Sequence, residues 1–474
     1  MRAPGFFGLV LFSAFLLTAC DNEGDTTTGF VTPPGGDPVP VVVNSPGQIA
    51  QQSADDYNAN TNGLITGATL QSWIDDWSAN RPTGISGRLI ILQVSNGDAG
   101  AEYITPKSTS GVLTYSMDTG RLVMNRSNGV ITTQSMVPDG STIDSILADY
   151  GIDPLNDMVV CAMGTGGASH AMRMGRCWYM LRYWGVPKEN LAVLNGGANS
   201  PLVLDPAYLG AEATCDENVA ETDCLPRSGQ VSVRNLPQDN TALQATMEDV
   251  LDVVTGEKQA FVWDARNEAQ YVGESFQNGG SKQGHPLGTY QLDYTNLLLI
   301  EDGSFRFKNK SHLSRYMNGE TVDGAQFVYY DSGATIPLGI GNAYQAGDTI
   351  ITYCETTFRA MITGFASVAI LGQPTRFYDG AMVEWNSLSH IQDLNGQFIL
   401  PADSPWRTDT NDRSVYVYGE SAAISPRIID DPYAAHADAI ILADKAYKRG
   451  TSSGGGDGGG GGGGSGLPAN PCGG

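Results

Sequence analysis

The sequence predicts two α/β domains, each built on a parallel β-sheet with helices on both faces. The prediction rests on two observations: apolar runs of strand length alternate with amphipathic helical segments, and this alternation occurs twice along the chain. The length of 474 residues is too great for one ordinary hydrophobic core and agrees with two or three domains. The hydrophobic fraction of 41% is typical of a globular protein.

The two copies contain matching segments in the same order. The first copy contains RLIILQVSN (88–96), MVVCAMG (158–164), AMRMGRCWYMLRYWG (171–185) and LAVLNGG (191–197). The second contains QAFVWDARN (259–267), TIITYCE (349–355), FRAMITGFASVAILG (358–372) and TRFYDGA (375–381). Each copy therefore predicts a parallel sheet, and ligands bind such sheets at the carboxyl ends of the strands.

Changes in composition along the chain predict its organisation. The predicted regions are a signal peptide (1–20), a flexible tether (21–60), a first α/β domain (61–210), a linker (211–245), a second α/β domain (246–400), a C-terminal extension (401–450) and a glycine-rich tail (451–474). The tether is rich in Thr, Gly, Pro and Val, and the tail is almost all glycine, so neither is expected to fold alone.

The amino terminus predicts export and a lipid anchor. Arg2 precedes a short apolar run, 6–17, which ends in the Leu-Thr-Ala-Cys pattern of a bacterial lipobox at Cys20. We expect the mature chain to begin at a lipid-modified Cys20, in the bacterial cell envelope and facing the periplasm or the outside. The alternative is a plain secretory signal that contains a cysteine. The sequence leaves the choice of membrane open.

The charge of the chain excludes one class of partner. There are 27 basic and 51 acidic residues, for a net charge of −24. The acidic residues are spread along the chain, so the phosphate backbone of a nucleic acid would be repelled. A small anionic substrate would need a local positive charge, which gives an arginine beside a reactive group particular interest.

Cys354 is expected at the carboxyl edge of the second sheet. The apolar residues 350–353 predict a buried strand, Cys354 ends it, and a helix begins a few residues later. A thiol at such a turn faces backbone N–H groups and the positive end of the helix dipole, which favour the nucleophilic thiolate. Arg359 can reach back across the loop to hold an anion. The alternative is that Cys354 is a small core residue.

Four ordered segments resemble the second domain of a tandem rhodanese: VWDARNEAQYVGE (262–274), GHPLGTYQLDYTNLL (284–298), ITYCETTFR (351–359) and RFYDGAMVEW (376–385). The first half resembles the inactive partner domain of that family. The resemblance implies that Cys354 takes a sulfane sulfur from a small anionic donor, such as thiosulfate or 3-mercaptopyruvate, and holds it as a persulfide. It then implies transfer to a thiol or cyanide-like acceptor, without a cofactor.

The family's active loop runs six residues from the cysteine, which matches Cys354, Glu355, Thr356, Thr357, Phe358 and Arg359. Related phosphatases place the arginine one position later, so this loop length favours sulfur over phosphate. Arg266 stands where the family has an arginine that binds the anionic group of the donor. The resemblance implies that Arg266 and residues 355–359 bind the donor, although a surface ion pair would explain Arg266 equally well without it.

The loop also departs from the family. Glu355, Thr356 and Thr357 follow neither the basic loop of members that use thiosulfate nor the Cys-Gly-Ser-Gly pattern of those that use mercaptopyruvate. The sequence therefore indicates neither donor. Glu355 should oppose formation of a thiolate and repel anions unless it faces solvent or pairs with an arginine.

Two further positions differ in the second copy. Gln270 and Tyr271 replace the Arg-Phe pair that supplies the family's second donor-binding arginine, so anion binding is expected to be weaker or differently built. His285 lies in the altered turn 284–288. We expect it to hold that turn, with a general-base role as the less favoured alternative.

The first copy lacks the reactive residues. Met163 stands where the cysteine would be, and Gln93 and Ser95 replace the Asp and Arg of the second copy. A methionine cannot carry a persulfide, which predicts an inactive first domain. Cys161 within the strand and Cys177 within the helix are expected to pack in the core.

The remaining cysteines and histidines predict no metal site. Cys215 and Cys224 bracket an acidic loop, and in an exported protein a local disulfide is the simplest explanation. The histidines show no ligand pair at helical or finger spacing; they are His170, His285, His312, His390 and His436.

Two other functions remain open from the sequence. In one, the second domain has drifted towards inactivity and serves as a binding module, which the altered loop permits. In the other, Cys354 is a redox thiol that exchanges with Cys472 on the flexible tail. The simpler explanation for Cys472 is an incidental thiol.

Overall fold

The computed structural model describes residues 29–31, 39–95, 102–164, 168–216, 219, 231–275, 284–301, 304–390, 392, 396–410, 412–415 and 428–450. The signal peptide with Cys20, as well as Cys224 and Cys472, lies outside the described residues. The expectations that rest on these cysteines therefore stay predictions. Within the described part of the chain, no helix is both long and apolar enough to cross a membrane.

The first sheet has five strands, all parallel, in the order β3-β10-β9-β4-β6. The strands are β3 (Gly63–Ile65), β4 (Leu89–Ser95), β6 (Val112–Asp118), β9 (Met158–Met163) and β10 (Leu191–Leu194). Their apolar residues bury alternate side chains on opposite faces, as the period of a strand requires.

The second sheet repeats this topology. Its first five strands are parallel in the order β13-β22-β21-β14-β16, so the chain visits equivalent positions in the same sequence in both sheets. They are β13 (Gln244–Ala245), β14 (Phe261–Asp264), β16 (Tyr290–Gln291), β21 (Ile350–Tyr353) and β22 (Thr375–Tyr378). An antiparallel hairpin, β19 (Val328–Asp331) and β20 (Ala334–Pro337), extends the sheet beyond β16. The predicted duplication is thus present in the fold.

Helices cover both faces of each sheet, as predicted. On the first sheet, one face packs on α2 (Gly67–Asp75) and α3 (Trp77–Asn80), and the other on α4 (Gly140–Asp149) and α5 (Ala168–Tyr183). On the second, one face packs on α7 (Met247–Val254) and α11 (Ala381–Ser387), and the other on α9 (Lys310–Met317) and α10 (Ala360–Phe365).

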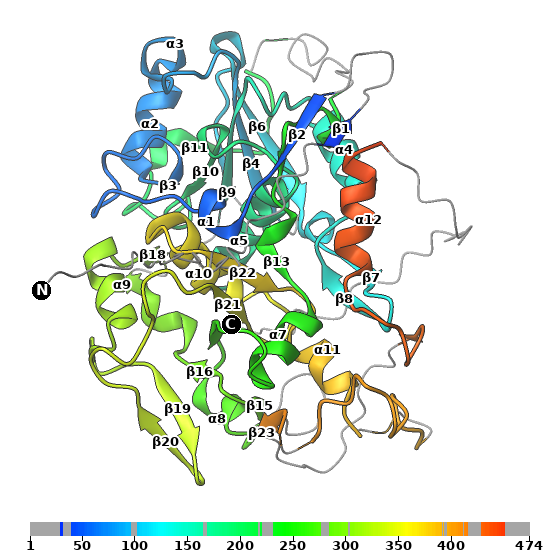
Figure 1. Ribbon diagram of the computed structural model, residues 1–474. Helices are drawn as coiled ribbons and strands as arrows, with labels where there is room; N and C mark the ends of the chain where they lie inside the picture. Colours follow the sequence, from blue (N-terminus) through cyan, green and yellow to red (C-terminus); the bar gives the residue numbers. More distant parts are fainter. Residues whose placement is uncertain are drawn as a thin grey trace, which may run out of the picture.

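The two domains share one hydrophobic core. Helices α5 and α10 pack against each other between the sheets (Figure 1). Apolar residues of both domains therefore form one continuous cluster. Gly175 on α5 permits the close approach, because a Cβ atom there would lie 2.8 Å from the Cβ of Met361. This layer places the first domain directly behind the helix that follows Cys354.

The structure differs from the predicted tether over residues 39–60. Strand β2 (Val39–Val43) pairs in parallel with β12 (Gln238–Asp239), and a short helix α1 (Pro46–Ile49) follows. Val41 and Ile49 are buried, which anchors this segment to the folded body. Composition alone suggested a flexible chain because the few apolar residues show no regular period.

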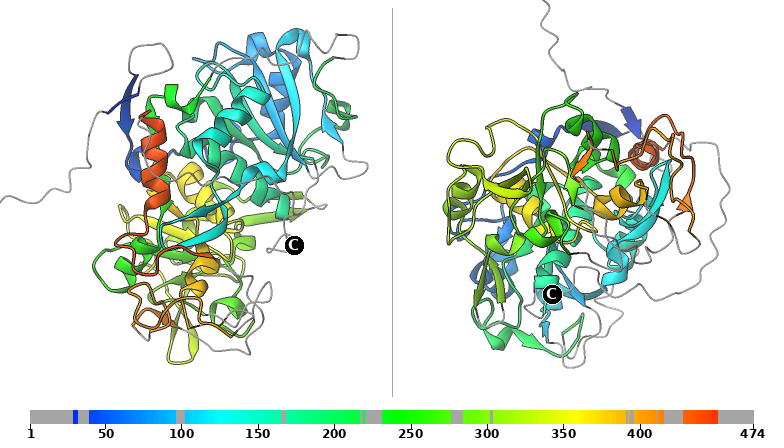
Figure 2. Two further views of the ribbon diagram at one scale, coloured as in Figure 1. Left: turned by 90° about the vertical axis from the view of Figure 1, so that its right-hand side faces the viewer. Right: turned by 90° about the horizontal axis from the view of Figure 1, so that it is seen from below.

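The C-terminal extension returns to the first domain. Its helix α12 (Ala439–Lys448) lies beside α4 and β7 (Met124–Ser127) (Figure 1). Figure 2 shows the same helix, in red, from two further sides. Asp444 of α12 forms an ion pair of 2.6 Å with Arg126 and accepts a hydrogen bond from the Tyr183 hydroxyl.

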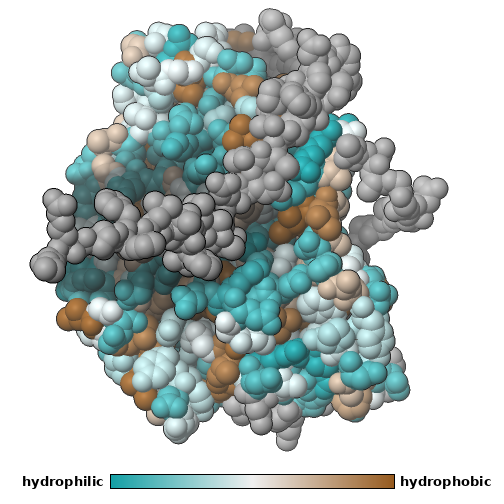
Figure 3. Space-filling model, viewed as in Figure 1, coloured by the Kyte–Doolittle hydropathy of each residue, from teal (hydrophilic) through white to brown (hydrophobic). Residues whose placement is uncertain are grey.

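The surface seen from the side of Figure 1 is mostly hydrophilic, with small scattered hydrophobic areas (Figure 3).

Candidate active site

Cys354 follows β21 directly, at the carboxyl edge of the second sheet. It is completely buried and keeps its thiol. Its carbonyl accepts a hydrogen bond of 3.1 Å from the Met382 N–H, and the Glu355 carbonyl accepts one of 3.0 Å from the Val383 N–H. The start of α11 therefore holds the first two residues of the loop in place.

The loop from Glu355 to Arg359 folds inward. Glu355, Thr356, Thr357 and Arg359 are buried, and Phe358 packs against the shared core. Thr357 has a φ of 64°, an unfavourable value for a β-branched residue. Its hydroxyl donates hydrogen bonds to the carbonyls of Tyr378 and Asp379, at 3.0 and 2.9 Å, which helps to offset that strain.

Arg266 is buried beside this loop with two carboxyl groups. Its Nε donates to Asp264 Oδ1 at 2.9 Å and its Nη2 donates to Asp264 Oδ2 at 2.6 Å. Its Nη1 lies 3.7 Å from Glu355 Oε2. Burial alone would lower the pKa of Arg266, but the charge and hydrogen bonds of Asp264 raise it above the ordinary value. Arg266 therefore keeps its positive charge. Of the two arrangements that the sequence leaves open for Glu355, facing solvent or pairing with an arginine, the structure has the pair with an arginine.

Arg359 and Gln270 contact each other across the site. Arg359 Nη1 donates to Gln270 Oε1 at 2.5 Å. Gln270 therefore helps to fix the position of the Arg359 guanidinium. The sequence did not predict this contact, since the two residues are 89 positions apart.

His285 holds its turn, as the sequence predicted. Its Nδ1 lies 2.8 Å from the carbonyl oxygen of Tyr271, and the two rings stack with centroids 3.7 Å apart. Burial lowers the pKa of His285 to about 4, so the ring is neutral at pH 7. The rings of His285 and Tyr330, which is on β19, form a T-shaped contact with centroids 5.8 Å apart, so the hairpin β19–β20 contacts this turn.

The first domain contributes Arg176 to the support of the loop. Arg176 forms a buried ion pair with Asp379, and its guanidinium carbon lies 6.0 Å from the centroid of the Phe358 ring. The backbone carbonyl of Asp379 is the group that accepts a hydrogen bond from Thr357. The sequence does not single Arg176 out, because this helix also contains Arg173 and Arg182.

The first sheet confirms the positional match of the two copies. Gln93 pairs with Ala162 as Asp264 pairs with Tyr353, so Met163 occupies the position of Cys354. The Gln93 side chain donates to the Glu102 carbonyl at 2.8 Å and accepts from the Ile104 N–H at 3.0 Å. In the first domain Gln93 therefore binds nearby backbone groups, whereas at the matching position of the second domain Asp264 binds Arg266.

Two cysteines predicted as separate core residues are joined. Cys161 and Cys177 are both buried but form a disulfide that links β9 to α5. The sequence does not indicate this bond, because a buried cysteine in a strand and another in a helix are equally typical of core packing. Cys215 is also disulfide-bonded, and its predicted partner Cys224 lies outside the described residues.

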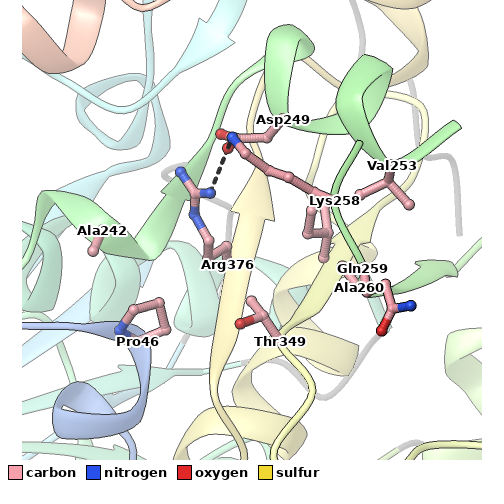
Figure 4. A pocket seen from close by; sticks show the side chains of 10 residues that line it. Pro46, Ala242, Asp249, Val253, Lys258, Gln259, Ala260, Thr349 and Arg376 are labelled. Atoms are coloured by element: carbon pink, nitrogen blue, oxygen red, sulfur yellow. Dashed lines mark hydrogen bonds and ion pairs between the residues drawn. The ribbon is translucent and has the colours of Figure 1, made fainter. Parts of the chain in front are cut away.

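Two cavities lie away from Cys354. One of about 340 Å³ lies at the amino ends of β14 and β21, beside the ion pair of Arg376 and Asp249 (Figure 4). The other, of about 770 Å³, lies at the carboxyl ends of β3 and β10, beside Arg306. Neither includes a residue of the loop 354–359.

Among the described residues, no group of three or more His, Cys, Asp or Glu side chains is arranged to hold a metal ion.

No protein-family model matches the sequence, and no curated protein matches it. Solved structures with a similar arrangement include 3-mercaptopyruvate sulfurtransferase from Leishmania major, at 13% identity and a TM-score of 0.43, covering 68% of this chain and 74% of that one. SseA from Escherichia coli, a 3-mercaptopyruvate sulfotransferase with the "Rhodanese" fold, has 17% identity and a TM-score of 0.40, covering 68% and 98%. An anaerobic ergothioneine biosynthesis enzyme from Chlorobium limicola has 14% identity and a TM-score of 0.46, covering 71% and 70%.

Proposed function

We propose that this protein is a sulfurtransferase that carries a sulfane sulfur on Cys354. The observation that supports it most is the placement of a buried thiol at the end of β21, in a six-residue loop with Arg359 at its end and Arg266 beside it. Cys354 precedes a strand-to-helix turn whose first residue, Glu355, lies 3.7 Å from Arg266 and whose last residue is Arg359. Cationic groups near a cysteine favour its thiolate, the form that attacks sulfur. The proposal depends on both arginines being near the loop that begins at Cys354.

The proposed reaction needs no cofactor and no oxidant. The Cys354 thiolate attacks the outer sulfur of thiosulfate, a sulfur–sulfur bond forms to the enzyme, the sulfur–sulfur bond of the donor breaks, and sulfite leaves with the electron pair. With 3-mercaptopyruvate the carbon–sulfur bond breaks, the thiol proton is transferred to carbon, and pyruvate leaves. A thiol or cyanide acceptor then takes the outer sulfur and regenerates the thiolate. Charge and atoms balance in each case.

The test is the production of thiocyanate from cyanide with either donor, by the full chain and by a Cys354→Ser variant. The proposal predicts turnover by the wild type that the variant lacks. A Cys161→Ser, Cys177→Ser double variant is the matched control, because it removes two other sulfur atoms and should keep the activity if it remains folded. Equal rates in wild type and Cys354→Ser would refute the proposal.

A second candidate is a binding module that has lost catalysis. The complete burial of Cys354, together with a carboxylate at Arg266 where an anion would bind, favours it. It predicts that no donor loads Cys354 while a protein partner is retained. The thiocyanate assay separates these two functions.

For its location, we propose a lipid anchor at Cys20 in the bacterial cell envelope. The disulfide of Cys161 and Cys177 and the disulfide-bonded Cys215 support an oxidising compartment. Metabolic labelling with a radioactive fatty acid tests this, because label in the wild type should be lost in a Cys20→Ala variant. Label that persists in the variant would contradict it.

A further inference from the structure

The charged groups around Cys354 balance one another. Two cations, Arg266 and Arg359, face two carboxyl groups, Asp264 and Glu355, and all four side chains are 5% exposed or less. Asp264 engages Nε and Nη2 of Arg266. The third guanidinium nitrogen, Nη1, lies 3.7 Å from Glu355 Oε2. With Glu355 ionised, this site carries no net positive charge for a donor.

Glu355 lies where an anion would bind. A carboxylate or sulfonate group on a donor would need the Nη1 edge of Arg266, because Asp264 and the Gly284 carbonyl engage its other edge. A second anion near Glu355 in a buried site is unfavourable unless one of the two is neutralised. Asp264 is held by Arg266 and by the Tyr353 hydroxyl at 2.9 Å, so Glu355 is the carboxyl that can change its charge.

The surroundings of Glu355 make protonation easier than in water, because its pKa is raised. Burial raises the pKa of Glu355, the charges of Arg266 and Arg359 lower it, and those of Cys354 and Asp264 raise it, with a net increase. These four groups lie on the loop, at or just after the end of β14, and directly before α10. An anionic donor in contact with Arg266 would raise the pKa of Glu355 further, because a second negative charge nearby disfavours the carboxylate.

We infer that Glu355 is the residue that selects the charge of the sulfur donor: its carboxylate occupies the anion position at Arg266, and an anionic donor binds only together with one proton taken up by Glu355. This inference rests on the proposed sulfur transfer at Cys354. Donors without an anionic group at that position would bind without the proton. By linkage, the affinity for thiosulfate falls as pH rises above the pKa of Glu355.

The experiment separates binding from chemistry by using Cys354→Ser in the full chain, which cannot accept sulfur. Thiosulfate is titrated into it calorimetrically at pH 8, in two buffers of different ionisation enthalpy, to count the protons taken up. The inference predicts about one proton per bound thiosulfate. The double variant Cys354→Ser, Glu355→Gln should take up none and bind thiosulfate on the order of tenfold more tightly.

Binding of thiosulfate without proton uptake by the Cys354→Ser variant, or absence of binding, would overturn the inference. So would the same proton uptake in the double variant. Because the titration needs no sulfur transfer, proton-coupled binding combined with an inactive wild type would overturn the proposed function and leave the role of Glu355 at this anion site intact. An exposed-site control, Cys354→Ser with Glu257→Gln, should behave as Cys354→Ser does.

Discussion

Arg176 on α5 and Asp379 after β22 form an ion pair between the two domains, and both side chains are completely buried. Asp379 Oδ2 also accepts a hydrogen bond of 2.6 Å from the Val137 N–H. Because the carbonyl of Asp379 accepts a hydrogen bond from Thr357, the first domain supports the loop that follows Cys354 in the second domain.

Arg176→Met should lower the free energy of unfolding by roughly 3–5 kcal/mol, because it leaves the charge of Asp379 buried without its cation. Denaturant unfolding measures this. Arg315→Met, which breaks the solvent-exposed pair with Glu320, is the control and should have a much smaller effect, because exposed ion pairs contribute little to stability. Adding Asp379→Asn to Arg176→Met should recover part of the loss. Equal effects for the two single variants would contradict the role of the buried pair.

Glu384 should make stability depend on pH. It is buried on α11, and burial raises its pKa to about 7 from 4.5, although hydrogen bonds from Tyr378 and Asn128 lower it. The folded state therefore holds this proton more tightly than the unfolded state, and the stabilisation present below pH 4.5 is lost as pH rises through about 7. The loss should reach at most about 3 kcal/mol. Unfolding of Glu384→Gln from pH 5 to 8 should lack this component, and a slope equal to that of the wild type would contradict it.

His285 should contribute a dependence of opposite sign. Burial lowers its pKa to about 4 from 6.5, so the unfolded state binds the proton more tightly. The stability it contributes is present above pH 6.5 and is lost as pH falls through about 4. We expect His285→Phe to remove this acid sensitivity relative to the wild type, while the exposed His436→Phe should keep it. Indistinguishable acid unfolding of wild type and His285→Phe would count against a neutral, buried ring.

The disulfide between Cys161 and Cys177 should stabilise the first domain. It closes a loop with a sequence separation of 16, for which the restriction of the unfolded chain corresponds to about 3 kcal/mol. A Cys161→Ala, Cys177→Ala double variant should lose approximately that amount in denaturant unfolding, and a reductant should have less effect on it than on the wild type. Peptide mapping without reduction tests the pairing itself, and recovery of both cysteines as thiols would contradict it.

The sequence predicted the duplicated fold because that signal is local. Apolar runs at 89–94 and 261–264 mark the central strands, and their order along the chain sets the topology. The match of Met163 with Cys354 followed from the same spacing, and the strand register confirms it. Such features depend on the spacing of apolar residues along each strand and helix, which can be seen in a single sequence.

Long-range partners could not be predicted in this way. Arg176 and Asp379 are 203 positions apart, and only the packing of α5 against α10 brings them together. The contact of Arg359 with Gln270 and that of Glu355 with Arg266 depend on how the loop folds inward. Residues 39–60 joined the folded body because β12, far along the chain, supplies a pairing strand.

The most direct test of the central claim is the intact mass of the full chain before and after incubation with thiosulfate or 3-mercaptopyruvate, beside the Cys354→Ser variant. We predict a gain of one sulfur atom in the wild type with at least one donor, its loss after cyanide treatment, and no gain in the variant. A mass unchanged by both donors, or the same gain in Cys354→Ser, would contradict sulfur transfer through Cys354.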